Sequence, residues 1–223
     1  MEPALSNDTI TVTAYSARYL AAVEELLGIE GGFVDDRTDR GGTTKYGISL
    51  RFLVAEGAFD EDGDGKADFD LDMDGDIDGA DIRKLTVGDA KYLYQRCFWK
   101  PLNAESFPRP IGEMLFDQGV NGGLNAAKKM LQRALNTCLM EARQRIGSNS
   151  APDLLIVDGA LGVLSRNALI WVLRHPPQGM TAIVQGYRAA VRDRYRAIVA
   201  RYPSQQKYLR GWLARAERLG HSK

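Results

Sequence analysis

The residues best suited to chemistry lie between Ile29 and Leu50, in the stretch IEGGFVDDRTDRGGTTKYGISL. Glu30 ends an apolar run, and two glycines follow it directly. A carboxyl group at the end of an apolar helix is partly desolvated, and this raises its pKa because the charged form is disfavoured. A glycosidase needs such a carboxyl group as its general acid. Glu30 is therefore a candidate acid, and the alternative is a solvated helix end capped by glycine.

A second motif lies in the acidic segment 57–81. A twelve-residue frame beginning at Asp70 has aspartates at positions 1, 3, 5, 7, 9 and 12, namely Asp70, Asp72, Asp74, Asp76, Asp78 and Asp81. Gly75 stands at position 6 and the apolar Ile77 at position 8, which is the pattern of an EF-hand calcium loop. Position 12 is Asp rather than Glu, as in dockerin repeats. The pattern predicts a Ca²⁺ site with a structural or regulatory role, and the alternative is a disordered acidic loop.

An overlapping frame begins ten residues earlier. Its acidic positions are Asp60, Asp62, Asp64 and Asp68, and Gly65 stands at position 6. Position 12 is Leu71, so this frame lacks the acid that closes an EF-hand loop, although Asp70 or Asp72 could be shared. The sequence thus predicts one good calcium site and one doubtful one.

Charge is distributed unevenly along a chain whose formal net charge is zero. The segment from Asp60 to Asp81 holds eleven acids and one base, so the remaining chain has 28 bases and 18 acids, an excess of ten positive charges. A basic body suits an anionic polymer such as bacterial cell wall or nucleic acid. The arginines near the C-terminus could bind anionic wall or outer-membrane lipid, and the alternative is a solvated helix face. They are Arg188, Arg192, Arg196 and Arg201.

Two cysteines, Cys97 and Cys138, lie in apolar helical segments, so buried thiols are expected rather than a disulfide. Free thiols fit folding in a reducing cytoplasm. The first residues, MEPALSNDTITVTAYS, do not resemble a standard signal peptide, and no apolar run is long enough for a conventional membrane span.

Hydrophobic periodicity predicts a mainly α protein of about eight helices. The first helix runs from Ser16 to about Ile29, and a loop or small β-hairpin over 31–47 separates it from a helix that ends at Gly57. A further helix starts at Thr86 and ends at Pro101. The helical segments beyond it are two helices broken at 121–123, one helix after 162, and helical structure over 180–219.

Several blocks of the sequence resemble one known family. They are Glu30–Phe33, Gly41–Ser49, Phe98–Leu102, Phe116–Gly123, Leu131–Leu135 and Val157–Gly159 with Gly162. In this order they resemble glycoside hydrolase family 108, the N-acetylmuramidases of phages and bacteria once called secretion activators. Val163 stands where the family usually has proline, and the acidic insertion is not part of the usual pattern.

The resemblance implies a lysozyme-like helical fold with Glu30 as the catalytic acid. Phage-type lysozymes place a second acid and then a threonine after their glutamate, and here Asp39 lies nine residues after Glu30 and Thr44 five residues after Asp39. Asp35 and Asp36 compete with Asp39 for the role of second carboxylate. Tyr46 is expected to line the sugar cleft. Asn121 is a candidate for binding an acetamido group, and the alternative is a turn residue with positive φ.

The resemblance also implies the domain division and the function. Residues 1–15 are expected to form a tail and 16–223 one domain, with the insertion at 57–81 and a peptidoglycan-binding-like part at about 150–219. The expected activity is hydrolysis of the β-1,4 bond between N-acetylmuramic acid and N-acetylglucosamine by a monomeric phage endolysin with no nucleic-acid partner. It would be made in the host cytoplasm and reach the wall through a holin or on lysis.

Two other functions are possible on the sequence alone. A lytic transglycosylase cuts the same bond with an intramolecular hydroxyl and leaves anhydro ends. A non-enzymatic, calcium-dependent wall-binding module would use the dockerin-like loop and give Glu30 no role.

Overall fold

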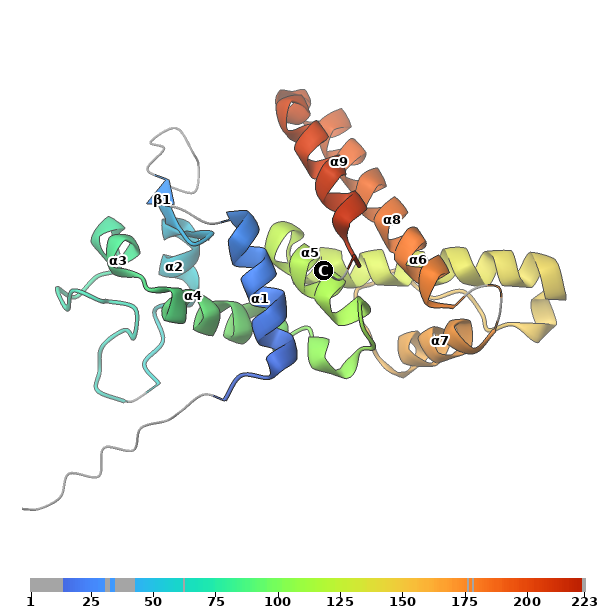
Figure 1. The fold of residues 1–223 in the computed structure, drawn as a ribbon, viewed down its shortest axis with the longest axis horizontal. Helices are drawn as coiled ribbons and strands as arrows, with labels where there is room; N and C mark the ends of the chain where they lie inside the picture. The colour runs from blue at the N-terminus through green and yellow to red at the C-terminus, as the bar shows by residue number, and fades with distance from the viewer. Residues whose placement is uncertain are drawn as a thin grey trace, which may run out of the picture.

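The computed structural model describes residues 14–30, 33–34, 43–61, 63–175, 177 and 179–221. This part of the chain is mainly helical (Figure 1), which confirms the predicted fold class. Its α-helices are α1 (Ala17–Glu30), α2 (Leu50–Glu56), α3 (Gly79–Lys84), α4 (Val87–Tyr94), α5 (Ile111–Gly122), α6 (Leu124–Ile146), α7 (Val163–Arg174), α8 (Met180–Arg201) and α9 (Leu209–Arg218). The shorter helical elements are the π-helix η1 (Gln95–Trp99) and the 3-10 helices η2 (Ala104–Ser106), η3 (Ser148–Ser150) and η4 (Pro203–Tyr208). None of the described helices is both long and apolar enough to cross a membrane.

A small antiparallel sheet follows α1 along the chain. Its strands are β1 (Phe33–Val34), β2 (Thr44–Lys45) and β3 (Ile48–Ser49), in the order β1-β2-β3. Tyr46 and Gly47 join β2 to β3, and both have positive φ, 53° and 76°, as a two-residue type I′ turn requires. The β-hairpin predicted beside Glu30 is therefore present.

Local caps set the helix boundaries that the sequence predicted. The hydroxyl of Ser16 accepts a hydrogen bond from the Tyr19 amide at 3.0 Å, and Thr86 forms a capping box with Asp89. The break between α5 and α6 falls at Gly123, whose φ of 86° excludes helix continuation. The helix predicted between residue 47 and Gly57 begins at Leu50, because Ile48 and Ser49 pair with β2.

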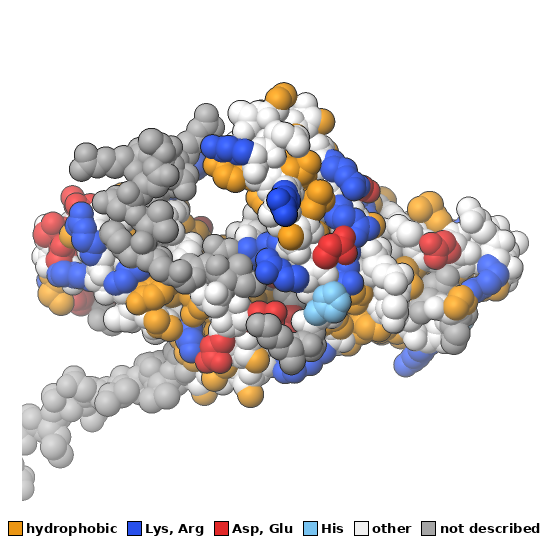
Figure 2. Space-filling view, turned by 45° about the horizontal axis from the view of Figure 1, so that its top comes forward, with side chains coloured by type: hydrophobic (Ala, Val, Ile, Leu, Met, Phe, Trp, Pro, Cys, Tyr) orange, Lys and Arg blue, Asp and Glu red, His pale blue; other side chains and the backbone are white. Residues whose placement is uncertain are grey.

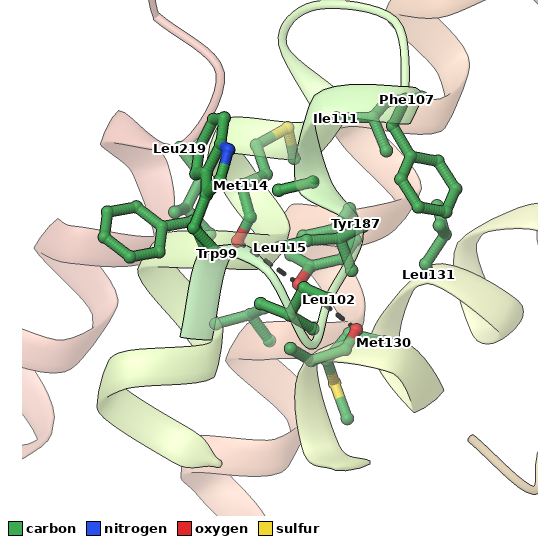
Figure 3. Packing of buried hydrophobic residues seen from close by; sticks show 14 of the residues in the cluster. Trp99, Leu102, Phe107, Ile111, Met114, Leu115, Met130, Leu131, Tyr187 and Leu219 are labelled. Atoms are coloured by element: carbon green, nitrogen blue, oxygen red, sulfur yellow. Dashed lines mark hydrogen bonds between the residues drawn. The ribbon is translucent and has the colours of Figure 1, made fainter. Parts of the chain in front are cut away.

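The hydrophobic core joins the two halves of the chain. Figure 3 shows Tyr187 of α8 among side chains from η1, α5 and α6. Tyr187 is buried, and its hydroxyl donates towards the carbonyls of Met114 at 3.4 Å and Ala127 at 3.3 Å. At Gly186 the backbones of α8 and α6 approach so closely that a Cβ atom would lie 3.2 Å from the Cα of Ala134. Helices α8 and α9 then extend together away from this core (Figure 1).

Helix α1 is fixed by one polar clamp and one buried aromatic ring. Arg18 binds both carboxylate oxygens of Glu113 at 2.7 Å and donates to the Phe107 carbonyl at 2.7 Å. Tyr19 is fully buried against Trp99 and Phe116, with ring centroids 5.4 and 5.9 Å away. These contacts fix the direction of the helix that ends at Glu30.

We expect Arg18→Met to lower the free energy of unfolding by about 2–3 kcal/mol, because it leaves the Phe107 carbonyl without this donor and the half-buried Glu113 carboxylate with only the more exposed Arg109, 3.4 Å away. Urea denaturation followed by circular dichroism measures the change. The matched control is Lys91→Met, whose partner Glu24 is 64% exposed, and it should cost less than about 1 kcal/mol. Equal losses in the two variants would contradict the role of the clamp.

Candidate active site and acidic loops

The described backbone places Glu30 at the last position of α1, three residues before β1. The predicted helix end is therefore confirmed, and the glutamate stands where the chain turns into the sheet. The side chain of Glu30 and the whole of Asp35, Asp36 and Asp39 lie outside the described residues. The choice among the three aspartates stays a prediction.

Thr44 and Tyr46 belong to the same hairpin. Thr44 lies on the central strand, opposite Val34 on one side and Ser49 on the other. The Tyr94 hydroxyl of α4 donates to the Tyr46 carbonyl at 3.0 Å. The strand that carries the candidate hydroxyl is thus tied to the helical body of the protein.

Asn121 lies in the last turn of α5, so the alternative of a turn residue with positive φ is wrong. Its side-chain amide donates to the Asp117 carbonyl at 2.8 Å. It also lines a groove of about 370 Å³ between the end of α5 and helices α8 and α9. The groove could not be predicted from neighbouring residues, because its lining comes from α5, α8 and α9, which are far apart in the sequence.

The acidic segment folds as two turns of the same geometry, ten residues apart. In the second turn the Asp70 carboxylate accepts the amides of Asp74 at 3.1 Å and Gly75 at 2.9 Å. In the first, Asp60 accepts the corresponding amides of Asp64 and Gly65 at the same two distances. The glycines at position 6 have φ of 102° and 85°. The predicted frames are therefore two copies of one loop conformation.

Only the second loop is closed by an acid at position 12. Asp81 is fully buried, and its carboxylate accepts the amides of Leu71 at 2.6 Å and Asp78 at 2.7 Å. Asp78 caps α3, so the loop leads directly into a helix, as in an EF hand. In the first loop Asp68 accepts the amide of Glu61 instead, at 3.3 Å, and Asp62 lies outside the described residues.

The carboxylates of the second loop lie close to one another. Among the described residues, ligand oxygens lie within 4.8 Å of one another in two sets, Asp70 with Asp72 and Asp74, and Asp76 with Asp78 and Asp81. One buried oxygen, Oδ1 of Asp72, has no hydrogen-bond partner. Burial raises the pKa of Asp72, and Asp74 and Asp81 raise it further. The neighbouring carboxylates, Asp74 first, raise the pKa of Asp76. A group of carboxylate ligands that includes a buried oxygen without a hydrogen-bond partner fits a hard divalent cation such as Ca²⁺.

Two phenylalanines that do not belong to the predicted calcium frames attach this segment to α4. Phe59 and Phe69 precede the first acid of each loop, and their rings lie 5.7 Å apart. Tyr92 of α4 lies 6.1 Å from one ring and 6.3 Å from the other. The repeated Phe–Asp pair at a ten-residue spacing was the signal that could have identified them.

The exit of the second loop also contacts the hairpin. The Lys45 ammonium of β2 donates to the Arg83 carbonyl of α3. A Cβ atom at Gly79, the first residue of α3, would lie 3.8 Å from the hydroxyl of Thr43. Helix α3, into which the acidic loop leads, is thus hydrogen-bonded to the strand that carries Thr44.

A mainly helical body with a glutamate at a helix end beside a small antiparallel sheet defines the lysozyme-like class of fold. Residues 23–123 match the family described as glycosyl hydrolase 108, and residues 126–217 match the family described as predicted peptidoglycan domain. The chain is therefore a glycoside hydrolase that combines a family 108 region with a peptidoglycan domain and acts on peptidoglycan.

The fold is shared with a solved structure. SagA from Brucella abortus superposes with a TM-score of 0.62 at 21% sequence identity, over 91% of each chain. No curated protein matches the sequence.

We expect Asp72→Asn to raise the melting temperature when divalent cations are chelated at pH 7, because it removes a carboxylate whose charged form the fold disfavours. The pKa of Asp72 in the folded protein lies above its unfolded value of 3.8. The destabilisation by the charged carboxylate is therefore absent below pH 3.8 and grows as the pH rises from there through the folded pKa. The difference should therefore shrink towards pH 4. Asp193→Asn, at an exposed ion pair, is the control. Scanning calorimetry that finds Asp72→Asn less stable in chelator would contradict the interpretation.

Proposed function

We propose that this protein is a muramidase that hydrolyses the β-1,4 bond between N-acetylmuramic acid and N-acetylglucosamine. The observation that carries the proposal is the position of Glu30, at the end of α1 and next to the sheet, inside the segment that matches glycosyl hydrolase 108. The substrate class follows from the peptidoglycan domain in the second half.

In this proposal Glu30 protonates the oxygen of the leaving sugar. A second carboxylate stabilises the oxocarbenium-like transition state or activates water. Asp39 is the preferred candidate for this role, ahead of Asp35 and Asp36. The Thr44 hydroxyl holds that water, and Tyr46 contributes to the sugar cleft. Two carboxyl groups and a hydroxyl are sufficient for this hydrolysis, so the acidic loop has no chemical role in it.

A lytic transglycosylase would cut the same bond and needs no second carboxylate. Mass spectrometry of digested peptidoglycan distinguishes the two reactions, because hydrolysis leaves reducing sugars and transglycosylation leaves anhydro ends. We expect reducing ends.

We expect Glu30→Gln to reduce the rate of peptidoglycan clearing at least about a hundredfold, since a general acid contributes that much to a reaction of this kind. Turbidity of purified cell walls measures the rate. Glu24→Gln makes the same change on the same helix, at an exposed position, and should keep full activity. Full activity in Glu30→Gln would end the assignment of this residue.

The second carboxylate is tested separately with Asp35→Asn, Asp36→Asn and Asp39→Asn. We expect Asp39→Asn to cause the greatest loss of the three. A larger loss in either of the others would transfer the role to that residue.

We also propose that Ca²⁺ binds the loop Asp70–Asp81 and has a structural or regulatory role. The support is the EF-hand spacing, the two oxygen clusters and the unpartnered Asp72 oxygen. Bound cation would offset the repulsion among six carboxylates and would hold α3 against β2. The first loop, Asp60, Asp62, Asp64 and Asp68, is a weaker candidate because no acid stands at its position 12.

We expect saturating Ca²⁺ to raise the melting temperature by roughly 5–10 °C over chelator, because a ligand at about a hundred times its Kd adds about 2.7 kcal/mol. Asp81→Asn should abolish this shift, since it removes the closing charge, while Asp68→Asn should keep most of it. An unchanged melting temperature in calcium and chelator would refute the cation site.

The biological role that we propose is that of a phage endolysin, made in the host cytoplasm and released to the wall through a holin or on lysis. Cys138 is a buried free thiol, as predicted, whereas Cys97 is half-buried; free thiols suit folding in a reducing compartment. Binding of anionic outer-membrane lipid by the α8 arginines is less well supported. Arg192 pairs with Glu217, Arg196 with Asp193, and Arg188 donates to the Leu219 carbonyl.

A further inference from the structure

The groove between α5, α8 and α9 has the chemistry of an anion site. Its lining includes three arginines, Arg194 from α8 and Arg215 and Arg218 from α9. Arg215 is held by the Asp117 carboxylate at 2.9 Å, which balances one of the three charges. Arg194 lies across Gly122 and donates to its carbonyl at 3.1 Å. The groove therefore has an excess of positive charge, and two of its three arginines are held in place.

Arg218 is the exposed member of this set. Among the described residues, no hydrogen bond or ion pair engages its guanidinium group. It lies three residues after Arg215 on α9, so the two side chains share a face of the helix. A guanidinium group in this position can bind a carboxylate with two parallel hydrogen bonds.

The other wall of the groove is aromatic. Trp212 packs against the buried Tyr195 with ring centroids 5.2 Å apart, and against Tyr208 at 5.9 Å. Figure 2 shows hydrophobic and basic side chains side by side on the part of the surface formed by α8 and α9. A ligand for this groove therefore combines an anionic group with an apolar or sugar surface.

Gly211 lines the groove without a side chain to fill it. It stands inside α9, where glycine costs about 1 kcal/mol relative to alanine. A Cβ atom there would meet no atom within 4 Å, so packing within the described protein does not require glycine. A volume of about 370 Å³ is in the range of small-molecule sites. Asn121, at the opposite edge, adds an amide that can bind a carbonyl or an acetamido group.

We propose that this groove binds a carboxylate of the peptide stem of peptidoglycan, with Arg218 and Arg194 on the carboxylate and Trp212 against the adjoining apolar part. The proposal rests on peptidoglycan being the substrate and adds a peptide contact to the glycan contacts at the hairpin. In this proposal the second half of the chain recognises the stem peptide, which is not cleaved, and contributes to substrate specificity.

The test is calorimetric binding of a purified disaccharide–tetrapeptide muropeptide to the calcium-loaded, full-length Glu30→Gln protein. This probe lacks the bond that the enzyme is proposed to cut, so binding is read independently of catalysis. We expect Arg218→Gln to weaken binding about five- to tenfold. Gly211→Leu, which favours the helix but fills the groove, should weaken binding without lowering the melting temperature.

Three control measurements distinguish carboxylate binding in the groove from other causes of a change in affinity. Arg210→Gln removes an arginine from the same helix outside the groove and should not change the affinity. A muropeptide whose carboxylates are capped as methylamides should bind the Glu30→Gln protein weakly. Its affinity should be the same when Arg218→Gln is added. Chitotetraose, a neutral glycan, should bind equally to both proteins.

Equal muropeptide affinity in Arg218→Gln and the parent would overturn the proposal, as would equal affinity for the capped and uncapped probes. Loss of binding to phosphatidylglycerol vesicles in Arg218→Gln, with unchanged muropeptide binding, would assign the groove to lipid phosphate and also overturn it. Failure of the muramidase assignment would be seen separately, as undiminished wall clearing by Glu30→Gln.

Discussion

The direction of α1 is the constraint on which the active site depends, because Glu30 is the last residue of that helix. Its N-terminal half is held by Arg18 and Tyr19, which contact segments seventy to ninety-five residues later in the chain. Gly112 makes this arrangement possible, since a Cβ atom there would lie 2.2 Å from the Ala104 carbonyl oxygen and 2.5 Å from the Arg18 guanidinium. The glutamate is therefore positioned from the far end of its helix, by Arg18 and Tyr19.

The features predictable from the sequence are those decided by neighbouring residues. Helix ends at Ser16, Gly57, Thr86 and Gly123 follow from caps and glycines, and the acidic loops follow from the spacing of their aspartates. The π-helix at Gln95–Trp99 could not be foreseen, because its sequence reads as a continuation of α4.

The parts of the site that escaped prediction depend on packing between distant segments. Asn121 was predicted as a candidate for binding an acetamido group from its place at a helix break, but Arg194 and Trp212, which line the same groove, come from α8 and α9. Likewise, position 4 of the second acidic loop is Met73 with φ of 63°, where the first loop has glycine. The side-chain pattern predicts the ligands of such a loop but not the strain in its backbone, which closure by the buried Asp81 must offset.

The core around Tyr187 has a consequence for protein engineering. The boundary between the two family matches falls at Gly123–Ala126, yet a hydroxyl from α8 hydrogen-bonds both to α5 on one side of that boundary and to α6 on the other. Met114 of α5 would lose its contacts with Tyr187 and with the segment around Gly220 if the chain were cut there. Exchange of wall-binding parts between lytic enzymes assumes that the parts are connected only by a linker. In this protein α8 completes the interior of the first region, so exchange of the whole second region would expose that interior, whereas substitutions on the exposed faces of α8 and α9 would leave it covered.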